Sequence, residues 1–112
     1  MAVSEGDLAF VLDQLDGLGT LRSRRMFSGV GLYCGDLFFA LMHGGRLYLK
    51  VDDRTRTRYT RRRLRPFAPR GTRSMSYYPV PAAILEDADQ LMVWAREAVE
   101  VAGRAAAAKT GE

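Results

Sequence analysis

Three apolar segments separated by two glycine turns constrain the fold of this chain more than any other feature of its sequence. The segments cover residues 30–34, 37–42 and 46–51. The outer two alternate in hydropathy, which is the period of a half-buried strand, whereas the middle one is apolar on both faces, as a central strand is. The turns at 35–36 and 44–45 contain glycine, which accepts the positive φ of tight hairpins. The sequence therefore predicts a three-stranded antiparallel meander.

Amphipathic helices are predicted before and after this meander. Ser4 is a suitable N-cap, and apolar residues follow it at helical spacing until Gly17 and Gly19 end the pattern. Near the other end, the run from Asp87 to Gln90 is typical of a capping box. The residues expected on the buried sides are Leu8, Val11, Leu12 and Leu15 in the first helix, and Leu91, Trp94, Ala95, Ala98 and Ala102 in the last. Helices flanking an antiparallel meander indicate an α+β fold.

Shorter elements are predicted next to the meander. Residues 21–26 carry three arginines and alternate weakly, which suits an edge strand. A short helix is expected from Asp52 to about Arg63, because acids stand at its start and arginines fall later, as the helix dipole favours. A fifth strand is expected at residues 73–78, closed by Pro79. The residues expected on the buried side of the short helix are Thr55, Tyr59 and Leu64.

Length and composition indicate one small domain. A chain of 112 residues has the usual size of a single domain. We expect it to cover residues 1–112, with a core at about 8–102 and a C-terminal extension at 103–112. One cysteine excludes an intrachain disulfide, the N-terminus does not resemble a secretory signal, and no stretch approaches the roughly 20 apolar residues that span a bilayer. These features predict a cytoplasmic protein that does not enter the membrane.

Positive charge is concentrated in one block. The net charge is +4, but residues 54–73 hold nine arginines and no acid. Such a surface attracts phosphate oxygens, in a manner blind to sequence and weakened by salt. The alternative is a solvated helix face enriched in arginine by a GC-rich genome, with some arginines paired to acids of the terminal helices. The residues predicted to contact nucleic acid or a partner are Arg54, Arg58, Arg61, Arg62, Arg65, Arg70 and Arg73. On a helix, the first five would lie largely on one side.

The sequence contains no arrangement of residues typical of catalysis. Cys34 and His43 fall at distant ends of paired predicted strands, so we expect a core cysteine and a turn histidine. One histidine and one cysteine cannot build an ordinary zinc site. The glycines at 29–31 lack the third glycine and the following helix of a dinucleotide-binding loop. A helix start explains Asp52 and Asp53 better than a pair of catalytic carboxylates does. We therefore expect no enzyme activity, metal, cofactor or small-molecule substrate.

Several strings along the chain are familiar when taken together. They are RMFSGVGLY at 25–33, RLYLKVDD at 46–53, LRPF at 64–67, MSYYPVP at 75–81 and LMVWAREA at 91–98. In this order, over about residues 8–102, they resemble the TfoX N-terminal domain family, the Sxy-like competence regulators. The resemblance implies an α+β fold of α-β(3)-α-β(2)-α type, with a single antiparallel sheet packed by the N- and C-terminal helices, and it implies no cofactor.

Two features differ from the usual pattern of that family. Residues 54–65 are dense in arginine where the family is usually mixed in charge, and Arg63 stands where a glycine is common. Full-length regulators also carry a second, C-terminal helical domain, for which this chain has no room. The resemblance therefore concerns the N-terminal domain alone.

Two hypotheses about function follow. The resemblance implies a role in regulation, historically of competence genes. The leading hypothesis is therefore a non-enzymatic regulatory domain that acts through protein contacts, including a homodimer across a sheet edge or helix face. The alternative is an accessory nucleic-acid-binding protein that uses residues 54–73. Tyr77 and Tyr78 are expected to be packing residues and not a platform for stacking bases.

Overall fold

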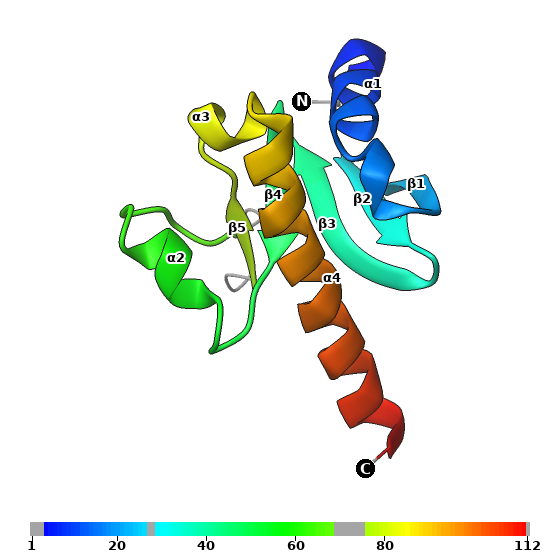
Figure 1. Ribbon diagram of the computed structural model, residues 1–112, viewed down its shortest axis with the longest axis vertical. Coiled ribbons are helices and arrows are strands. Elements are labelled where there is room, and N and C mark those ends of the chain that lie inside the picture. The colour runs from blue at the N-terminus through cyan, green and yellow to red at the C-terminus, as the bar shows by residue number, and fades with distance from the viewer. Residues whose placement is uncertain (1–3, 27–28, 69–75, 112) are drawn as a thin grey trace.

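The computed structural model describes residues 4–26, 29–68 and 76–111, with side chains up to Ala108. Its strands are β1 Leu21–Met26, β2 Gly29–Cys34, β3 Leu37–His43, β4 Arg46–Lys50 and β5 Tyr77–Pro79. Its helices are α1 Glu5–Gln14, α2 Arg56–Thr60, α3 Ala82–Leu85 and α4 Ala88–Gly111, with a 3-10 turn η1 Asp16–Leu18 after α1. The strands form one antiparallel sheet in the order β1-β2-β3-β4-β5 (Figure 1).

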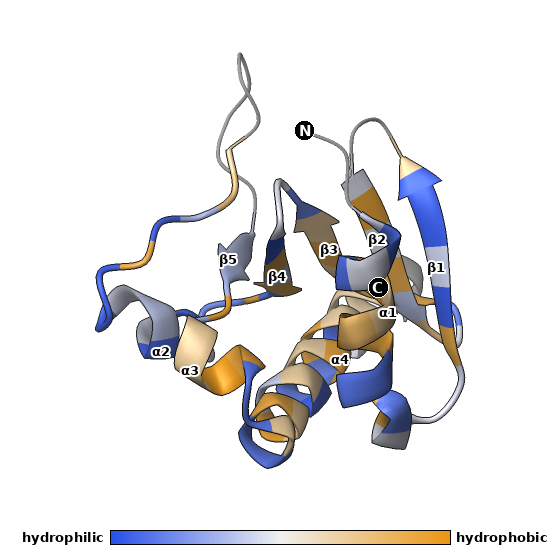
Figure 2. Cartoon of the chain, turned by 90° about the horizontal axis from the view of Figure 1, so that it is seen from above, coloured by the Kyte–Doolittle hydropathy of each residue, from blue (hydrophilic) through white to orange (hydrophobic). Residues whose placement is uncertain are grey.

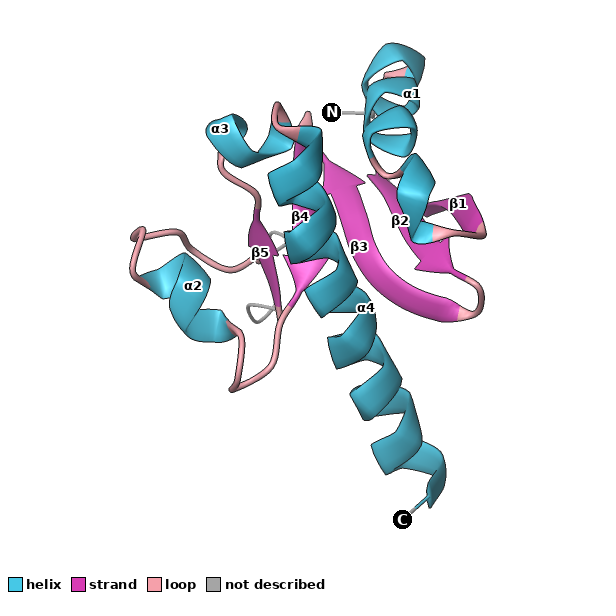
Figure 3. Cartoon of the chain, viewed as in Figure 1, coloured by secondary structure: helices cyan, strands magenta, loops and turns pink. Residues whose placement is uncertain are grey.

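The fold class is α+β, as predicted, with one antiparallel sheet and a helix from each end of the chain (Figure 3). The distribution of strands along the chain differs from the family pattern. Four strands precede α2 and one follows it, whereas the pattern implied three and two. β1 accounts for this division. All of its residues pair with β2, which confirms the edge strand expected at 21–26 and makes it a full member of the meander.

α4 lies across the sheet and supplies much of the core (Figure 1). Its predicted buried stripe is confirmed in full, since Leu91, Trp94, Ala95, Ala98 and Ala102 are all buried. The alanines let the helix approach the strands closely, and it packs mainly on β3 and β4, whose Ala40 and Leu49 belong to the same core. α1 adds Val11 and Leu15, and the side-chain amide of Gln14 donates a 3.0 Å hydrogen bond to the carbonyl of Leu85 in α3.

A bulge between β2 and β3 decides which aromatic residues face the core. Leu32 pairs with Ala40 but Tyr33 pairs with Phe38, so Phe39 is an extra residue in β3. Phe39 and Ala40 are both fully buried in the core. Phe38 instead stacks on Tyr33, with the ring centroids 5.1 Å apart. The apolar character predicted for both faces of this strand is thus confirmed, and the bulge changes the alternation.

The helices all lie on one face of the sheet (Figure 2). Over the ranges that the structure describes, no helix covers the opposite face, which carries Tyr33, Phe38 and Tyr48. The segment after α2 reaches this face along β5, because the backbone N–H of Phe67 donates a 2.7 Å hydrogen bond to the carbonyl of Tyr77. We call the surface opposite the helices the open face.

Two predicted elements have the wrong bounds. The helix expected at 52–63 is shorter than predicted and is confined to α2, with turns before and after it. Pro79 does not close the fifth strand but pairs with Tyr48, which an edge strand tolerates, while residues 73–75 lie outside the described residues. α3 was not predicted. None of the described helices has both the length and the hydropathy needed to span a bilayer.

Candidate functional site

The predicted contact arginines do not form one helical stripe. Five of the seven fall among the described residues, whereas Arg70 and Arg73 lie outside them. Of those five, α2 contains only Arg58, because the regular helix ends at Thr60. The remaining four stand in the turns and the extended segment around α2, so the structure distributes the charge over several surfaces.

Two of these arginines hold α2 against α4. The guanidinium groups of Arg58 and Arg62 lie over the ring of Trp94, at 4.8 and 5.1 Å from its centroid. Arg58 also donates a hydrogen bond to a carboxylate oxygen of Glu97 at 3.2 Å, and both side chains of this ion pair are largely buried. The rings of Trp94 and Tyr59 meet in an edge-to-face contact, so the cluster is continuous with the core. The pairing expected between this block and acids of the last helix is therefore confirmed for Arg58.

The other three described arginines are exposed. Within the described chain, no acidic side chain forms an ion pair with Arg54, Arg61 or Arg65. They also face different surroundings, because Arg54 borders one surface groove and Arg65 borders another. Any contact made by the arginine block would therefore fall mainly on these three side chains.

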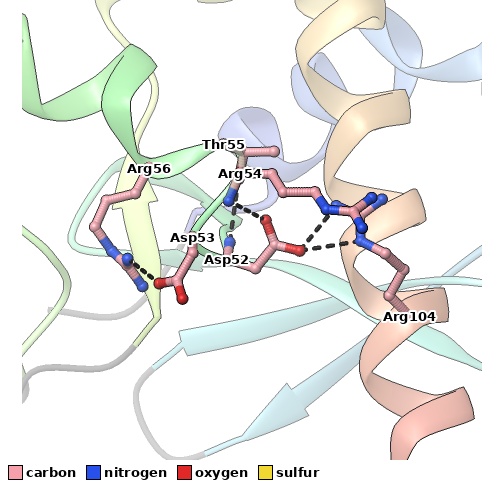
Figure 4. A network of polar contacts seen from close by, with 6 residues as sticks. All are labelled: Asp52, Asp53, Arg54, Thr55, Arg56 and Arg104. Carbon is pink, nitrogen blue, oxygen red and sulfur yellow. Dashed lines mark hydrogen bonds and ion pairs between the residues drawn. The ribbon is translucent and has the colours of Figure 1, made fainter.

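Asp52 lines the first groove, which has a volume of about 550 Å³, and is the centre of a network of polar contacts there (Figure 4). Its backbone N–H donates to the hydroxyl of Thr55, and one of its carboxylate oxygens accepts from the N–H of Arg54. The other oxygen accepts two hydrogen bonds from the guanidinium of Arg104, at 2.8 and 3.1 Å. The prediction that Asp52 starts a helix is thus modified, since this residue closes the turn before α2 and ties it to α4.

The two neighbouring aspartates do not converge on a shared site. Asp53 turns away from Asp52 and pairs with Arg56 at 2.6 Å (Figure 4). Burial raises the pKa of the Asp52 carboxyl, but the hydrogen bonds from Arg104 and from the backbone outweigh burial and hold that pKa below its ordinary value. A carboxylate held ionised by a guanidinium is a structural anchor, and a poor general acid.

The second groove has a volume of about 530 Å³ and lies between β4 and the segment after α2. We call it the aromatic groove. Its lining comprises His43, Arg46, Tyr48, Arg63, Leu64, Arg65, Pro66, Phe67, Ala68 and Pro79. No acid is among these residues, and no described acid forms an ion pair with its three arginines. This groove was not predicted from the sequence, because it depends on long-range contacts of Phe67, a hydrogen bond to Tyr77 of β5 and ring contacts with Tyr48 and His43.

Arg63 occupies a backbone position that normally suits glycine. Its φ is 59°, in the left-handed region. The N–H of Arg63 donates to the carbonyl of Thr60, and the N–H of Leu64 donates to that of Tyr59. This pair of hydrogen bonds defines a Schellman motif, which requires a left-handed residue one position past the helix cap. The motif explains why glycine is the residue expected there, and it presents the Arg63 side chain at the aromatic groove.

Comparison with known proteins decides the family. The family profile described as the TfoX N-terminal domain matches residues 13–102, which is most of the chain and includes the whole sheet. The chain belongs to the TfoX N-terminal domain family. No curated protein matches the sequence.

In this TfoX N-terminal domain the lone cysteine and histidine are far apart. Cys34 pairs with Leu37 at the start of β3, whereas His43 is the last residue of that strand. The thiol of Cys34 lies 3.8 Å from the carbonyl of Leu18 and packs against the core, as predicted. His43 stacks beside Phe67 instead of lying within the turn. In the described ranges, no cluster of three or more histidine, cysteine or acidic side chains could hold a metal ion.

Proposed function

We propose that this TfoX N-terminal domain is a non-enzymatic regulatory module that acts by binding a partner protein. The family match over residues 13–102 carries the proposal, because the family is of a competence-related, regulatory type. The surface chemistry agrees with it. Both grooves are lined by guanidinium and aliphatic groups, and the second also by aromatic rings, which suit binding. The carboxylates of the first groove, Asp52 and Asp53, are occupied by Arg104 and Arg56.

Regulation is tested in the native host. Deleting the gene should change the transcript levels of a defined set of genes, and expressing the intact chain should restore them. Leu49→Asp provides the matched negative control, because Leu49 is fully buried and a charge there should prevent folding. If transcripts are unchanged by deletion under conditions in which the protein is expressed, the proposal is wrong.

A second copy of the chain is the first protein partner to test. β1 is an edge strand, and its outer residues include Arg22, Arg24 and Arg25. Two copies paired along β1 would bring these like charges together, so such a dimer should strengthen as salt screens them. Analytical ultracentrifugation over a range of protein and salt concentrations checks this expectation. A monomer at every concentration would exclude the homodimer.

Duplex nucleic acid is the second candidate partner, favoured by the exposed charge of Arg54, Arg61 and Arg65, which form no ion pair with any described acid. Affinity should fall steeply with salt. Charge reversal is best made at Arg54 and Arg61, because reversal at Arg58 or Arg62 would remove the contacts with Trp94 and unfold the protein partly. If the wild-type protein gives no gel shift and no anisotropy change at low salt, duplex nucleic acid is excluded as the partner.

A further inference from the structure

The open face of the sheet carries aromatic rings at both ends of β3. At one end, Phe67 lies over Tyr48 and beside His43, with ring centroids 5.0 and 5.2 Å away. All three rings are half-buried, so part of each meets solvent at the aromatic groove. Phe67 and Tyr48 both line the groove.

A second aromatic cluster lies at the other end of β3. Phe38 stacks on Tyr33 at 5.1 Å and meets Tyr77 at 5.5 Å. Tyr33 and Phe38 are half-buried, whereas Tyr77 is buried and supports Phe38, which confirms that Tyr77 packs and is not itself a platform. The five residue steps from Phe38 to His43 separate the two clusters by roughly 16 Å along β3.

The charged side chains that the described strands place on the open face are all basic, and one of them, Arg22, pairs with Asp36 of the turn after β2 at 3.4 Å. None of the five strands contains an aspartate or a glutamate. Arg22 lies over the ring of Tyr33 at 5.7 Å, and the ammonium of Lys50 lies over the ring of Tyr77 at 5.0 Å. Arg24 follows Arg22 by two residues and therefore points to the same face. Arg46, Arg63 and Arg65 add three cations at the aromatic groove.

We propose that this face binds single-stranded nucleic acid. Half-exposed rings accept unpaired bases by stacking, which any base can do, and the surrounding cations attract the phosphates. A duplex hides the flat faces of its bases in the stack, so the same rings would add nothing to its affinity. Charge complementarity selects a polyanion, and the rings select one whose bases are free to stack. One base stacks on the exposed surface of Tyr48 and Phe67 at the aromatic groove, and the oligonucleotide continues toward Tyr33.

This inference goes beyond the regulatory proposal and does not depend on it. It also differs from duplex binding by Arg54, Arg61 and Arg65, because the open face uses mainly Arg46, Arg63, Tyr48 and Phe67, and only Arg65 belongs to both sets. A variant that loses oligonucleotide binding yet restores the transcripts in the deletion strain would separate the two functions.

Fluorescence anisotropy with short labelled oligonucleotides tests the site. The probes are oligo-dT, oligo-rU and a duplex of the same length, each titrated with the whole protein at several salt concentrations. We expect at least one single strand to bind more tightly than the duplex, and the tighter of the two identifies DNA or RNA as the ligand. Absence of binding by both single strands at low salt, or equal affinity for the duplex, would overturn the proposal.

Substitutions in the groove separate stacking from charge. Phe67→Leu and Tyr48→Leu retain apolar volume and should each raise the Kd about tenfold. The double variant Arg46→Gln/Arg65→Gln should lower the slope of log affinity against log salt by about 1.4, because each lost phosphate contact contributes about 0.7. The matched control is Arg54→Gln/Arg61→Gln, which removes the same charge outside the groove and should change the Kd less than about twofold.

The pattern of losses decides between the groove and general attraction to polyanions. If the control double variant loses as much affinity as the groove double variant, or if both leucine variants bind normally while folded, the proposal is wrong. Ring resonances in NMR spectra of the wild-type protein give a measurement that needs no variant. Signals of Tyr33, Phe38, Tyr48 and Phe67 should shift when the oligonucleotide is added, and shifts confined to the helical side would contradict the proposed face.

Discussion

Arg63 shows how one residue can place a cation at the expense of backbone strain. A non-glycine residue in the left-handed region costs roughly 1–2 kcal/mol, and the hydrogen bonds of Tyr59 and Thr60 require that region at position 63. Arg63→Gly should therefore raise the free energy of unfolding by about 1 kcal/mol. Urea denaturation at pH 7 measures this change.

Arg61 is the matched control for this prediction. Its φ of −61° is helical, so Arg61→Gly should lower stability by about 1 kcal/mol, the ordinary effect of glycine in a helical turn. The same substitution two residues apart is thus expected to have opposite signs. A loss of stability in both variants would show that the left-handed conformation at position 63 carries no strain. Because Arg63 lines the aromatic groove, the more stable variant should also bind oligonucleotides less tightly.

At the scale of elements, the ion pair between Asp52 and Arg104 links the turn before α2 to α4. The pKa of Asp52 lies below its ordinary 3.8 in the folded protein, so the carboxylate stabilises the fold above that pH, and this contribution is lost as the pH falls through the lowered pKa. Asp52→Asn should destabilise the protein at pH 7 by up to about 1 kcal/mol, since about a third of each side chain is exposed. The difference from wild type in urea denaturation should shrink below pH 4.

Asp53→Asn is the control for the ion pair between Asp52 and Arg104. Asp53 is almost fully exposed and its pairing with Arg56 lies within one turn, so this variant should match the wild type at every pH. An Asp52→Asn difference that persists undiminished at low pH would show that the effect comes from the turn geometry and not from the charge.

The hairpin elements depend on a close approach at Gly29. A Cβ added there would lie 2.5 Å from the carbonyl oxygen of Met42, and a backbone atom in a paired strand cannot move aside cheaply. Gly29→Ala should therefore destabilise the protein by roughly 1–3 kcal/mol. Thermal unfolding followed by circular dichroism measures the loss. Gly6→Ala is the control, because nothing lies near its Cβ position, and a similar loss in both would contradict the close-approach argument.

The elements were predictable from sequence where hydropathy repeats with a clear period. The meander and the buried stripe of α4 followed from alternation and from 3–4 spacing, and both are confirmed. The region around α2 was mispredicted, because a one-turn helix leaves no period to recognise and Arg58 and Arg62 are placed by packing on Trp94. The aromatic groove could not be foreseen, since it depends on a long-range backbone contact of Phe67. The second aromatic cluster could not be foreseen either, since it depends on the bulge that turns Phe38 outward.

At the scale of the whole molecule, two buried phenols limit stability at high pH. Burial raises the pKa of Tyr77 to about 12 and also raises that of Tyr59. Above the ordinary value of 10, the unfolded chain loses these protons first, so stability falls as pH rises through the folded pKa values. The fall should approach about 1.4 kcal/mol per pH unit for each tyrosine. Denaturation midpoints between pH 9 and 11.5 measure it.

Tyr77→Phe isolates one of the two phenols in this whole-molecule prediction. The variant lacks the titrating group at that position and should lose less stability between pH 9 and 11.5 than the wild type does. Identical pH dependence of the two proteins would show that Tyr77 ionises as freely in the folded state as in the unfolded chain.

The chain has a single tryptophan, and its place between α2 and α4 gives the molecule a built-in optical label. Trp94 belongs to α4, which lies on the helical side of the sheet (Figure 2), whereas the aromatic groove is lined by Tyr48 and His43 of the open face. Its fluorescence emission should therefore report unfolding and the docking of α2, yet should not change when an oligonucleotide occupies the aromatic groove. Excitation of tryptophan alone can thus follow the integrity of the protein in the same cuvette in which a labelled oligonucleotide follows binding.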